Sequence, residues 1–535
     1  MPTYLHIGEI NGRKVLMVKD QPFIMLAGEV HNSNSSSLAY MEGIWDQAEA
    51  LGMNCLLLPV TWELIEPKED EFDFSLVEGL IQQARRHEKK IGFLWFGAWK
   101  NAQCYYAPAW VKTDLERFKR AQVIKGKNFY RNEAFYGMPY TTRSYLCEET
   151  KKADAKAFGR LMAYIREIDS EENTVITVQV ENETGLMGSA RENSDEADTL
   201  FASEVPQDFA DYMRTHTDTM VEDVGDAVRA GASQGTWPEV FGDAAAEIFS
   251  AYYTASYVNS VAEAGKKAYP LPFTANCWLN KAGEVPGAYP SGGPVARMME
   301  VWRYCAPNID IIAPDIYVPN FMEVCNAYTK LGNPLYIPEC ATHSYAASRA
   351  VYCVGHHHAM CYSPFGFEDM GKPFSGSQMY LFGADVTDPA LQMPQNVEEY
   401  GKINRMLESM LPLLAAKYGT GELQASTAEV ENEASFNLGT YRINAVFESP
   451  ILQRKDGACL VLKESEDTFY VLAHAVSLQF MSNDPVRQSL DILELEEGEF
   501  VNGQWTRGRR FNGDEAALNS YMEPTLLRVR LFEYA

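Results

Sequence analysis

Two segments of the sequence end an apolar, strand-like run with carboxylates. The first, ITVQVENETG (176 to 185), contains Glu181, Asn182 and Glu183, and the second, PLYIPEC (334 to 340), contains Glu339. Two carboxylates facing each other across a pocket can cleave a glycosidic bond, because one attacks the anomeric carbon while the other protonates the departing oxygen. An amide beside such a carboxylate can hold a sugar hydroxyl next to the reacting carbon. These residue types point to carbohydrate chemistry.

Eight short apolar runs alternate with segments of helical spacing and would position these carboxylates. The runs cover residues 23 to 30, 53 to 62, 90 to 99, 173 to 182, 271 to 278, 309 to 317, 334 to 340 and 358 to 365. Between them apolar residues recur at intervals of three and four, as in 38 to 52, 75 to 90 and 152 to 168. This alternation predicts a parallel sheet covered by helices. Eight units favour an α/β fold of the (β/α)8 TIM barrel type over residues 1 to 415, with a doubly wound sheet as the alternative.

In a (β/α)8 barrel the carboxyl ends of the strands meet at one mouth, where active sites are built. Strand four, which ends in Glu181 and Glu183, and strand seven, which ends in Glu339, would bring carboxylates to opposite sides of that mouth, at a separation that could reach the roughly 5 Å of a retaining glycosidase. Other strand-end residues are candidate sugar contacts: His31, Asn32, Trp99, Asn101, Asn182, Trp278 and Tyr317. Further polar or aromatic residues at strand ends are Glu29, Trp62, Glu63, Lys100, Asn276 and Asp315. The indole rings suit the apolar face of a pyranose.

Helical spacing largely disappears after residue 415. Strand-like segments such as FNLGTYRINAVF predict a smaller C-terminal β-sandwich, an accessory domain over residues 416 to 535. Segments 100 to 150 and 184 to 236 exceed the length that a short barrel connection needs, and both follow strands. We expect them to form long loops at the mouth of the barrel.

The charge balance limits the partners of this chain. It carries 73 acidic and 46 basic residues, a formal net charge of −27, which argues against a nucleic-acid partner. An oligosaccharide or β-glycoside substrate fits this balance. The N-terminus lacks a basic segment followed by an apolar run of signal-peptide length, and nowhere do about 18 apolar residues follow one another. We therefore expect a soluble cytoplasmic protein without a membrane partner, and the sequence leaves open whether it forms a homo-oligomer.

The cysteines and histidines do not suggest a metal site. The ten cysteines are scattered singly, which indicates reduced, buried thiols rather than a disulfide framework or a paired metal motif. The run His356, His357 and His358 cannot direct all three rings to one ion. We expect no metal and no cofactor, and glycosidic cleavage by two carboxylates needs neither.

The segment Gln179-Val180-Glu181-Asn182-Glu183 resembles the Q-x-E-N-E signature of glycoside hydrolase family 35, the β-galactosidase family. The resemblance implies that Glu183 is the acid/base and that Glu339 is the nucleophile. It also implies that Tyr317 orients the nucleophile. Residues 62 to 75 are similar to the stretch after strand two of these enzymes, and residues 505 to 515 resemble the end of an accessory β-domain in a bacterial subgroup.

Periodicity alone does not choose between the two glutamates of the signature, because strand alternation sends Glu181 and Glu183 to the same face. The resemblance selects Glu183, and we interpret Glu181 as a buried structural carboxylate. Alternation also turns Asn182 away from the pocket. A sugar contact by Asn182 therefore requires a twist or bulge at this strand end.

The predicted activity is that of a retaining, exo-acting β-galactosidase that releases terminal β-galactosyl residues by double displacement. Thr184 replaces the Tyr or Phe that usually ends the signature, and the strand-three segment offers Lys100 and Asn101 where the family has an acidic sugar contact. These departures leave a β-glucosidase, a β-glucosaminidase or a β-glucosyltransferase open, with transglycosylation where a sugar hydroxyl replaces water. A catalytically inactive carbohydrate-binding barrel is the alternative of another class.

Overall fold

The computed structural model describes residues 5–128, 130–132, 138–374, 392–448, 452, 454–484 and 489–534. The chain divides into two compact units. Unit 1 comprises Met1–Val30, Gly43–Leu56 and Tyr317–Ala535, and unit 2 comprises His31–Glu42 and Leu57–Ile316. The predicted domain boundary between residues 415 and 416 stays a prediction.

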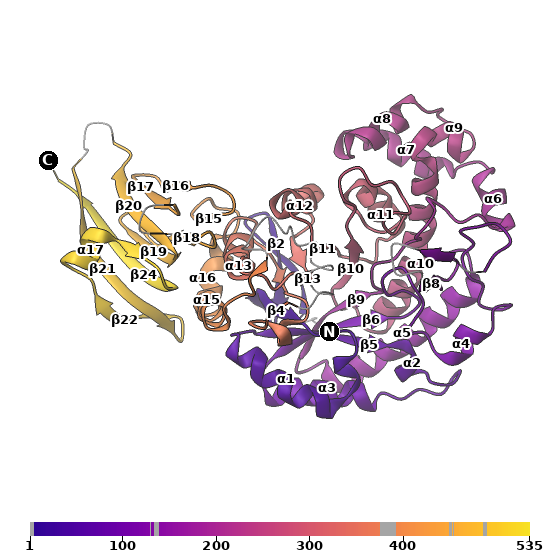
Figure 1. Cartoon of the computed structure of the whole chain (residues 1–535), viewed down its shortest axis with the longest axis horizontal. Coiled ribbons are helices and arrows are strands. Elements are labelled where there is room, and N and C mark those ends of the chain that lie inside the picture. Colours follow the sequence, from indigo (N-terminus) through magenta and orange to yellow (C-terminus); the bar gives the residue numbers. More distant parts are fainter. Residues whose placement is uncertain are drawn as a thin grey trace. The chain divides into compact units, whose positions relative to one another are not determined.

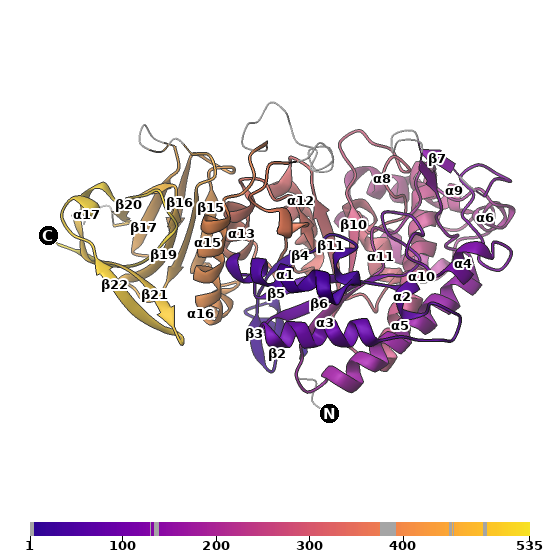
Figure 2. The ribbon, with the colours of Figure 1, turned by 60° about the horizontal axis from the view of Figure 1, so that its bottom comes forward.

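Nine strands form one sheet in the order β12-β14-β4-β5-β6-β9-β10-β11-β13 (Figure 1, Figure 2). Their bounds are β4 (Met25–Glu29), β5 (Cys55–Thr61), β6 (Lys90–Phe96), β9 (Val175–Val180), β10 (Phe273–Trp278), β11 (Ile311–Ile316), β12 (Tyr336–Ile337), β13 (Glu339–Cys340) and β14 (Cys361–Tyr362). The pairs β6–β9, β9–β10, β10–β11, β12–β14 and β14–β4 are parallel. Only Pro338 separates β12 from β13, which stand at opposite ends of the order. The sheet is therefore nearly closed as a barrel of eight strand positions, and the predicted barrel is confirmed.

Helices separate these strands along the chain. They include α1 (Leu38–Ala50), α3 (Ser75–Arg86), α5 (Glu148–Asp169), α10 (Ala245–Ala268), α11 (Met299–Cys305), α12 (Phe321–Tyr328), α13 (Ala346–Gly355) and α15 (Val397–Ser409). Helix α3 shows why the sequence folds this way, since its buried residues Val77, Leu80, Ile81 and Ala84 recur at three and four. The helices predicted within 38 to 52, 75 to 90 and 152 to 168 are confirmed.

Unit 1 also holds a three-stranded antiparallel sheet before the first barrel strand, which the sequence reading did not predict. It consists of β1 (Leu5–Ile10), β2 (Arg13–Val18) and β3 (Gln21–Phe23). After β14, unit 1 continues through α15 and α16 (Leu411–Lys417) into the C-terminal strands.

The C-terminal strands of unit 1 form two sheets, in the orders β15-β18-β19-β24-β21-β22 and β16-β17-β20-β23. Their bounds are β15 (Leu423–Thr427), β16 (Glu433–Asn437), β17 (Tyr441–Val446), β18 (Ala458–Lys463), β19 (Thr468–His474), β20 (Val476–Ser482), β21 (Leu490–Val501), β22 (Gln504–Arg510), β23 (Ser520–Tyr521) and β24 (Thr525–Glu533). Both sheets contribute to one apolar core, which includes Ile443, Val461, Val471 and Val529. The predicted C-terminal β-sandwich is thus confirmed.

Unit 2 carries a helical insertion where the sequence predicted a long loop. Between β9 and α10 lie α6 (Asp195–Phe201), α7 (Gln207–Thr215), α8 (Glu222–Ala230) and α9 (Trp237–Phe241). Aromatic contacts pack it on α10, since the Phe209 and Tyr252 rings lie 4.9 Å apart and the Trp237 and Phe249 rings 5.1 Å apart. Segment 100 to 150 holds α4 (Ala109–Thr113) and the β7 (Tyr130–Asn132) and β8 (Met138–Tyr140) hairpin, with residues 129 and 133–137 outside the described part.

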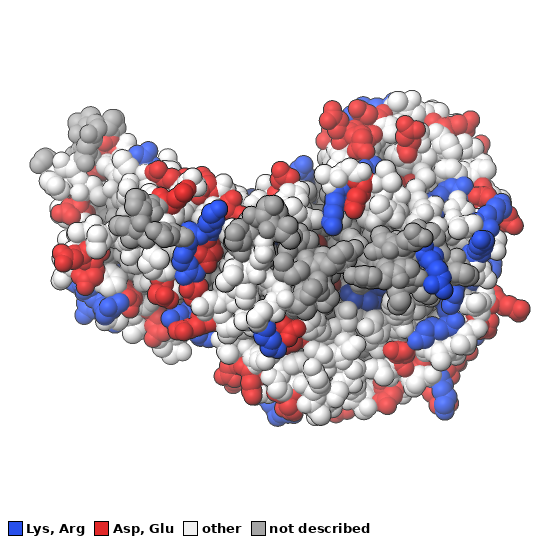
Figure 3. Space-filling model, in the orientation of Figure 1, with Lys and Arg blue, Asp and Glu red and all other residues white. Residues whose placement is uncertain are grey.

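Within the described residues, every helix is too short or too polar to cross a membrane. All ten cysteines are reduced thiols, as their scattered positions predict; nine of them are buried and Cys305 is half-buried. On the face shown in Figure 3, acidic and basic side chains are interspersed.

Candidate active site

The backbone turns sharply where β9 ends, at the predicted signature. Glu181 and Glu183 adopt left-handed backbone angles, with φ of 63° and 46°. Strand alternation therefore ends before Glu181, which supplies the irregularity that a sugar contact by Asn182 requires. A left-handed residue other than glycine costs about 1–3 kcal/mol and persists only where its surroundings hold it. The groups around this turn must therefore fix it.

The chain that follows β6 holds the turn on one side. The Trp99 amide donates to Oε2 of Glu181 at 2.7 Å. The Asn182 amide donates to the Trp99 carbonyl at 3.3 Å, and the Ala102 amide donates to the Glu183 carbonyl at 3.0 Å. All three residues of the signature that follow β9 are thus tied to the segment after β6.

The Asn276 side chain at the end of β10 holds the turn on the other side. Its Oδ1 accepts a 2.9 Å hydrogen bond from the Glu183 amide, and its Nδ2 donates a 2.7 Å bond to Oδ2 of Asp315 on β11. The Asp315 carboxylate accepts from the NH2 end of the Asn276 side chain and therefore directs the amide oxygen of Asn276 toward the Glu183 backbone. Asn276 and Asp315 thus position the acid/base candidate together. The sequence analysis predicts that Asn276 and Asp315 lie at strand ends, but it assigns no role to either residue.

The Glu181 side chain is buried and contacts Asp154 of α5. Both carboxyl groups are fully inaccessible to solvent. Burial raises the pKa of Glu181 well above its ordinary value, and the neighbouring charge of Asp154 raises it further. The predicted structural role of Glu181 agrees with this position. Asp154 was missed, although it lies four and seven residues before the buried Phe158 and Leu161, on the apolar face of the helix.

Within unit 1, the nucleophile candidate Glu339 lies at the start of β13. It is 4% exposed, and its Oε2 accepts a 2.8 Å hydrogen bond from the Tyr317 hydroxyl. Tyr317 follows β11 directly. The structure therefore brings together the two residues that the resemblance linked, and the hydroxyl fixes the orientation of the carboxylate.

A second buried network of unit 1 follows β13 in the chain. Arg349 of α13 donates to Glu429 between β15 and β16, with Nε at 2.9 Å from Oε2, and to Nε2 of His343 at 3.1 Å. Burial and the positive charge of Arg349 hold the pKa of His343 well below its ordinary value. Through Arg349, these hydrogen bonds connect the β-sandwich to the segment that follows Glu339.

The remaining predicted sugar contacts lie in unit 2 with different exposures. His31, Asn32, Asn101 and Trp278 are half-buried. Trp99 is only 1% exposed, and its ring meets Tyr257 edge-on with the ring centres 4.6 Å apart. Its indole packs in the interior of unit 2, and sugar contacts by these five residues stay predictions.

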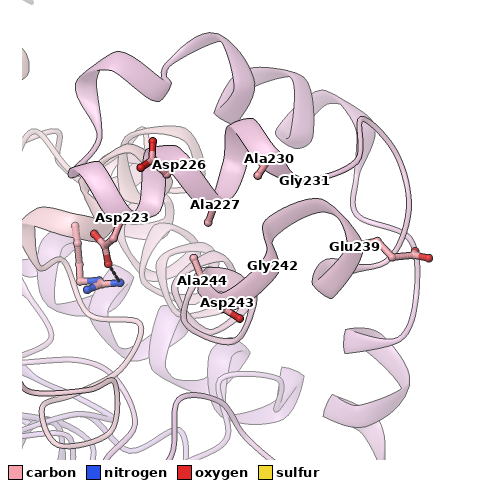
Figure 4. A pocket seen from close by; sticks show the side chains of 10 residues that line it. Asp223, Asp226, Ala227, Ala230, Gly231, Glu239, Gly242, Asp243 and Ala244 are labelled. Carbon is pink, nitrogen blue, oxygen red and sulfur yellow. Dashed lines mark ion pairs between the residues drawn. The ribbon is translucent and has the colours of Figure 1, made fainter.

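Unit 2 also contains a pocket of about 740 Å³ between α8, α9 and the short turn Gly242–Ala244 that precedes α10 (Figure 4). Its charged lining residues are Asp223, Asp226, Glu239, Asp243 and Arg297. Arg297 is already paired with Asp223 at 2.9 Å. Because the lining has no aromatic ring on which a sugar could stack, we assign no substrate to this pocket.

Comparison with known proteins matches one family model to part of the chain. The model is described as a domain of unknown function (DUF5597) and covers residues 400–522, from within α15 into the β-sandwich. The matched residues include none of the barrel strands. No curated protein matches the sequence.

Solved structures with similar folds include three β-galactosidases. The enzyme from Rahnella sp. R3 is 14% identical with a TM-score of 0.45, covering 74% of this chain and 57% of its own. The enzyme from Bacillus circulans sp. alkalophilus is 9% identical with a TM-score of 0.45, covering 95% and 99%. The enzyme from the psychrophilic Marinomonas ef1 is 11% identical with a TM-score of 0.47, covering 73% and 62%. This chain thus spans less than two thirds of the Rahnella and Marinomonas enzymes. Similarities of this size do not assign an activity, and membership of glycoside hydrolase family 35 stays a prediction.

Proposed function

We propose that this protein is a retaining, exo-acting β-glycosidase that releases terminal β-galactosyl residues. The observation that carries the proposal is the hydrogen bond from Tyr317 to Glu339, because it supplies the oriented carboxylate that a nucleophile needs, at the strand end where the resemblance predicts the nucleophile. The turn that presents Glu183 is equally well held, by Ala102 on one side and Asn276 on the other.

The proposed reaction has two steps. In the first, a carboxylate oxygen of Glu339 bonds to the anomeric carbon while the bond from that carbon to the leaving oxygen breaks, and Glu183 gives its proton to that oxygen. In the second, Glu183 removes a proton from water, whose oxygen bonds to the anomeric carbon and releases Glu339. The two inversions give net retention. A sugar hydroxyl in place of water would give transglycosylation.

The choice of galactose as the glycone rests on the signature. Lys100, which stands where the family has an acidic sugar contact, is 5% exposed and lies with Nζ 5.0 Å from the centre of the Phe96 ring. A panel of nitrophenyl β-glycosides would decide the glycone, and it should include galactoside, glucoside, N-acetylglucosaminide and the anionic glucuronide. If the enzyme releases nitrophenol from another glycoside and not from the galactoside, the proposed glycone is wrong, whereas the proposed mechanism still holds.

Three variants test the two catalytic roles. We expect Glu339→Gly to lose hydrolysis and to regain part of it with azide, giving a glycosyl azide of inverted configuration. Glu183→Gln should lose hydrolysis of substrates with poor leaving groups by about 10²-fold or more. Glu263→Gln, an exposed change on α10, should keep wild-type rates. Sugar binding without turnover by the wild type would identify an inactive carbohydrate-binding barrel instead.

A further inference from the structure

Asp154 of α5 is surrounded by hydrogen-bond donors in the interior of unit 2. Its Oδ1 accepts from the indole Nε1 of Trp95 at 2.8 Å, and its Oδ2 accepts from the Tyr257 hydroxyl at 3.0 Å. The carboxyl group of Glu181 is its neighbour, close enough for a side-chain hydrogen bond between the two carboxyl groups. An indole nitrogen only donates, so Asp154 must offer it an acceptor oxygen. These contacts favour an ionised Asp154.

Two carboxyl groups that share a hydrogen bond need one proton between them. Since Asp154 accepts from Trp95 and Tyr257, the proton belongs to Glu181. Oε2 of Glu181 accepts from the Trp99 amide at 2.7 Å, which leaves Oε1 to carry the proton toward Asp154. The pair is thus a neutral acid bound to a carboxylate.

Gly97, at the end of the run LWFG, makes room for this pair. A Cβ atom at residue 97 would lie 2.5 Å from Oε1 of Glu181 and 2.7 Å from Oδ1 of Asp154. Both oxygens therefore face the same small space beside the backbone that follows β6. A side chain at position 97 would push the two carboxyl groups out of place.

We propose that Asp154 and Glu181 are positioning residues that share one proton and hold the left-handed turn from which Glu183 acts as acid and base. The pair anchors the first residue of the turn to α5, whereas the Ala102 and Asn276 contacts hold its last residue. This inference rests on the proposed function, because it assigns a consequence for proton transfer by Glu183.

The location of the proton predicts an asymmetry between two conservative variants. In Glu181→Gln, the amide NH2 can donate to Asp154 while the amide oxygen accepts from the Trp99 amide, so the variant reproduces the neutral acid. In Asp154→Asn, one acceptor oxygen becomes an NH2 among donors that include Trp95 and Tyr257. We expect Glu181→Gln to keep kcat/KM within about threefold of wild type on all substrates, and Asp154→Asn to be impaired.

The leaving group distinguishes misplacement of the acid from general damage. Cleavage of an aryl glycoside with a dinitrophenol leaving group does not need a proton from Glu183, whereas cleavage of an alkyl glycoside or a disaccharide does. For Asp154→Asn we expect kcat/KM to fall by about 10²-fold on the poor leaving groups and by no more than about threefold on the dinitrophenyl glycoside. Tyr257→Phe, which removes one donor and leaves the pair intact, should show the same pattern more weakly and serves if Asp154→Asn does not fold.

Two outcomes would overturn the inference while leaving the proposed function standing. One is an equal loss on good and poor leaving groups, and the other is a Glu181→Gln enzyme as impaired as Asp154→Asn. The proton itself can be observed without turnover, as the carbonyl stretching band of a protonated carboxylic acid in the infrared difference between wild type and Glu181→Gln at mildly alkaline pH. Absence of that band would contradict the shared proton between Asp154 and Glu181. Absence of all glycoside hydrolysis by the wild type would instead contradict the proposed function.

Discussion

The Tyr317 hydroxyl donates a 2.8 Å hydrogen bond to Oε2 of Glu339. The two residues come from different strand ends, since Tyr317 follows β11 and Glu339 begins β13. The bond constrains the orientation of the carboxylate in the ground state. A nucleophile held in this way loses less freedom on the way to the transition state.

Removing the hydroxyl should slow the first chemical step. A hydrogen bond to a charged group contributes about 1.5–3 kcal/mol, so we expect Tyr317→Phe to lower kcat/KM by roughly tenfold to a hundredfold. Steady-state kinetics on an aryl glycoside would measure the loss. Tyr470→Phe, which removes a similar 2.7 Å bond to Glu464 in the β-sandwich, is the matched control and should keep wild-type kinetics. Unchanged kinetics for Tyr317→Phe would mean that the bond does not serve catalysis.

Truncating Asn276 should disturb the turn that presents Glu183. In Asn276→Ala the Glu183 amide loses its acceptor, and we expect unfolding to become easier by about 1–3 kcal/mol and kcat/KM on poor leaving groups to fall by about 10²-fold. Asn259 of α10 accepts a comparable 3.0 Å bond from the Asn308 amide. Asn259→Ala should therefore lower the stability of the protein without a loss of kcat/KM that depends on the leaving group. If both variants show the same kinetics, Asn276 has only a structural role.

The Glu181 carboxyl should make the folded state less stable as the pH rises. Its folded pKa is raised by burial and by the charge of Asp154. Above about pH 4.3 the unfolded chain releases this proton while the folded protein keeps it, so stability declines until Glu181 itself ionises. Gln at this position does not titrate. We expect urea denaturation to show that Glu181→Gln gains stability relative to wild type as the pH increases from about 4.3 to neutrality. A difference that is constant with pH would contradict the raised pKa.

The Arg349 and Glu429 pair should be a strong tie between α13 and the β-sandwich within unit 1. The Arg349 side chain is 3% exposed and that of Glu429 is 17% exposed, so loss of one charge leaves the other poorly compensated. We expect Glu429→Gln to destabilise the protein by about 3–5 kcal/mol in denaturant unfolding. The exposed pair of Lys68 and Glu71 offers the control, because Glu71→Gln should cost no more than about 1 kcal/mol. Equal effects of the two variants would show that the buried pair adds little.

The strands and the principal helices could be predicted because their apolar periodicity is local. All eight predicted runs contain strands of the barrel sheet, and the main difference is the break of the seventh run at Pro338. The three-stranded sheet at 5–23 was missed because its short strands have mixed burial, as in LHIGEI. The sequence does not predict the helices of the insertion because they are short and carry many polar residues, although Phe209, Ala210 and Met213 of α7 recur with helical spacing.

The site could be predicted only as far as residue type and strand position define it. The resemblance paired Tyr317 with Glu339, and the structure shows their hydrogen bond. The left-handed turn at Glu181 and Glu183 cannot be predicted from the spacing of apolar residues, because tertiary contacts stabilise it. The role of Asp154 could not be predicted, because it depends on which strand end α5 packs against in the folded protein.

The central claim is that Glu339 forms a covalent bond to the sugar, and a trapped intermediate tests it most directly. Incubation with a 2-deoxy-2-fluoro β-galactoside that carries a dinitrophenol leaving group should slow both steps and accumulate the glycosyl-enzyme. Peptide mass spectrometry should then place one fluorosugar on Glu339, and Glu339→Gly should remain unlabelled. Labelling of Glu181, Glu183 or any residue other than Glu339, or stoichiometric dinitrophenol release without labelled protein, would contradict the account.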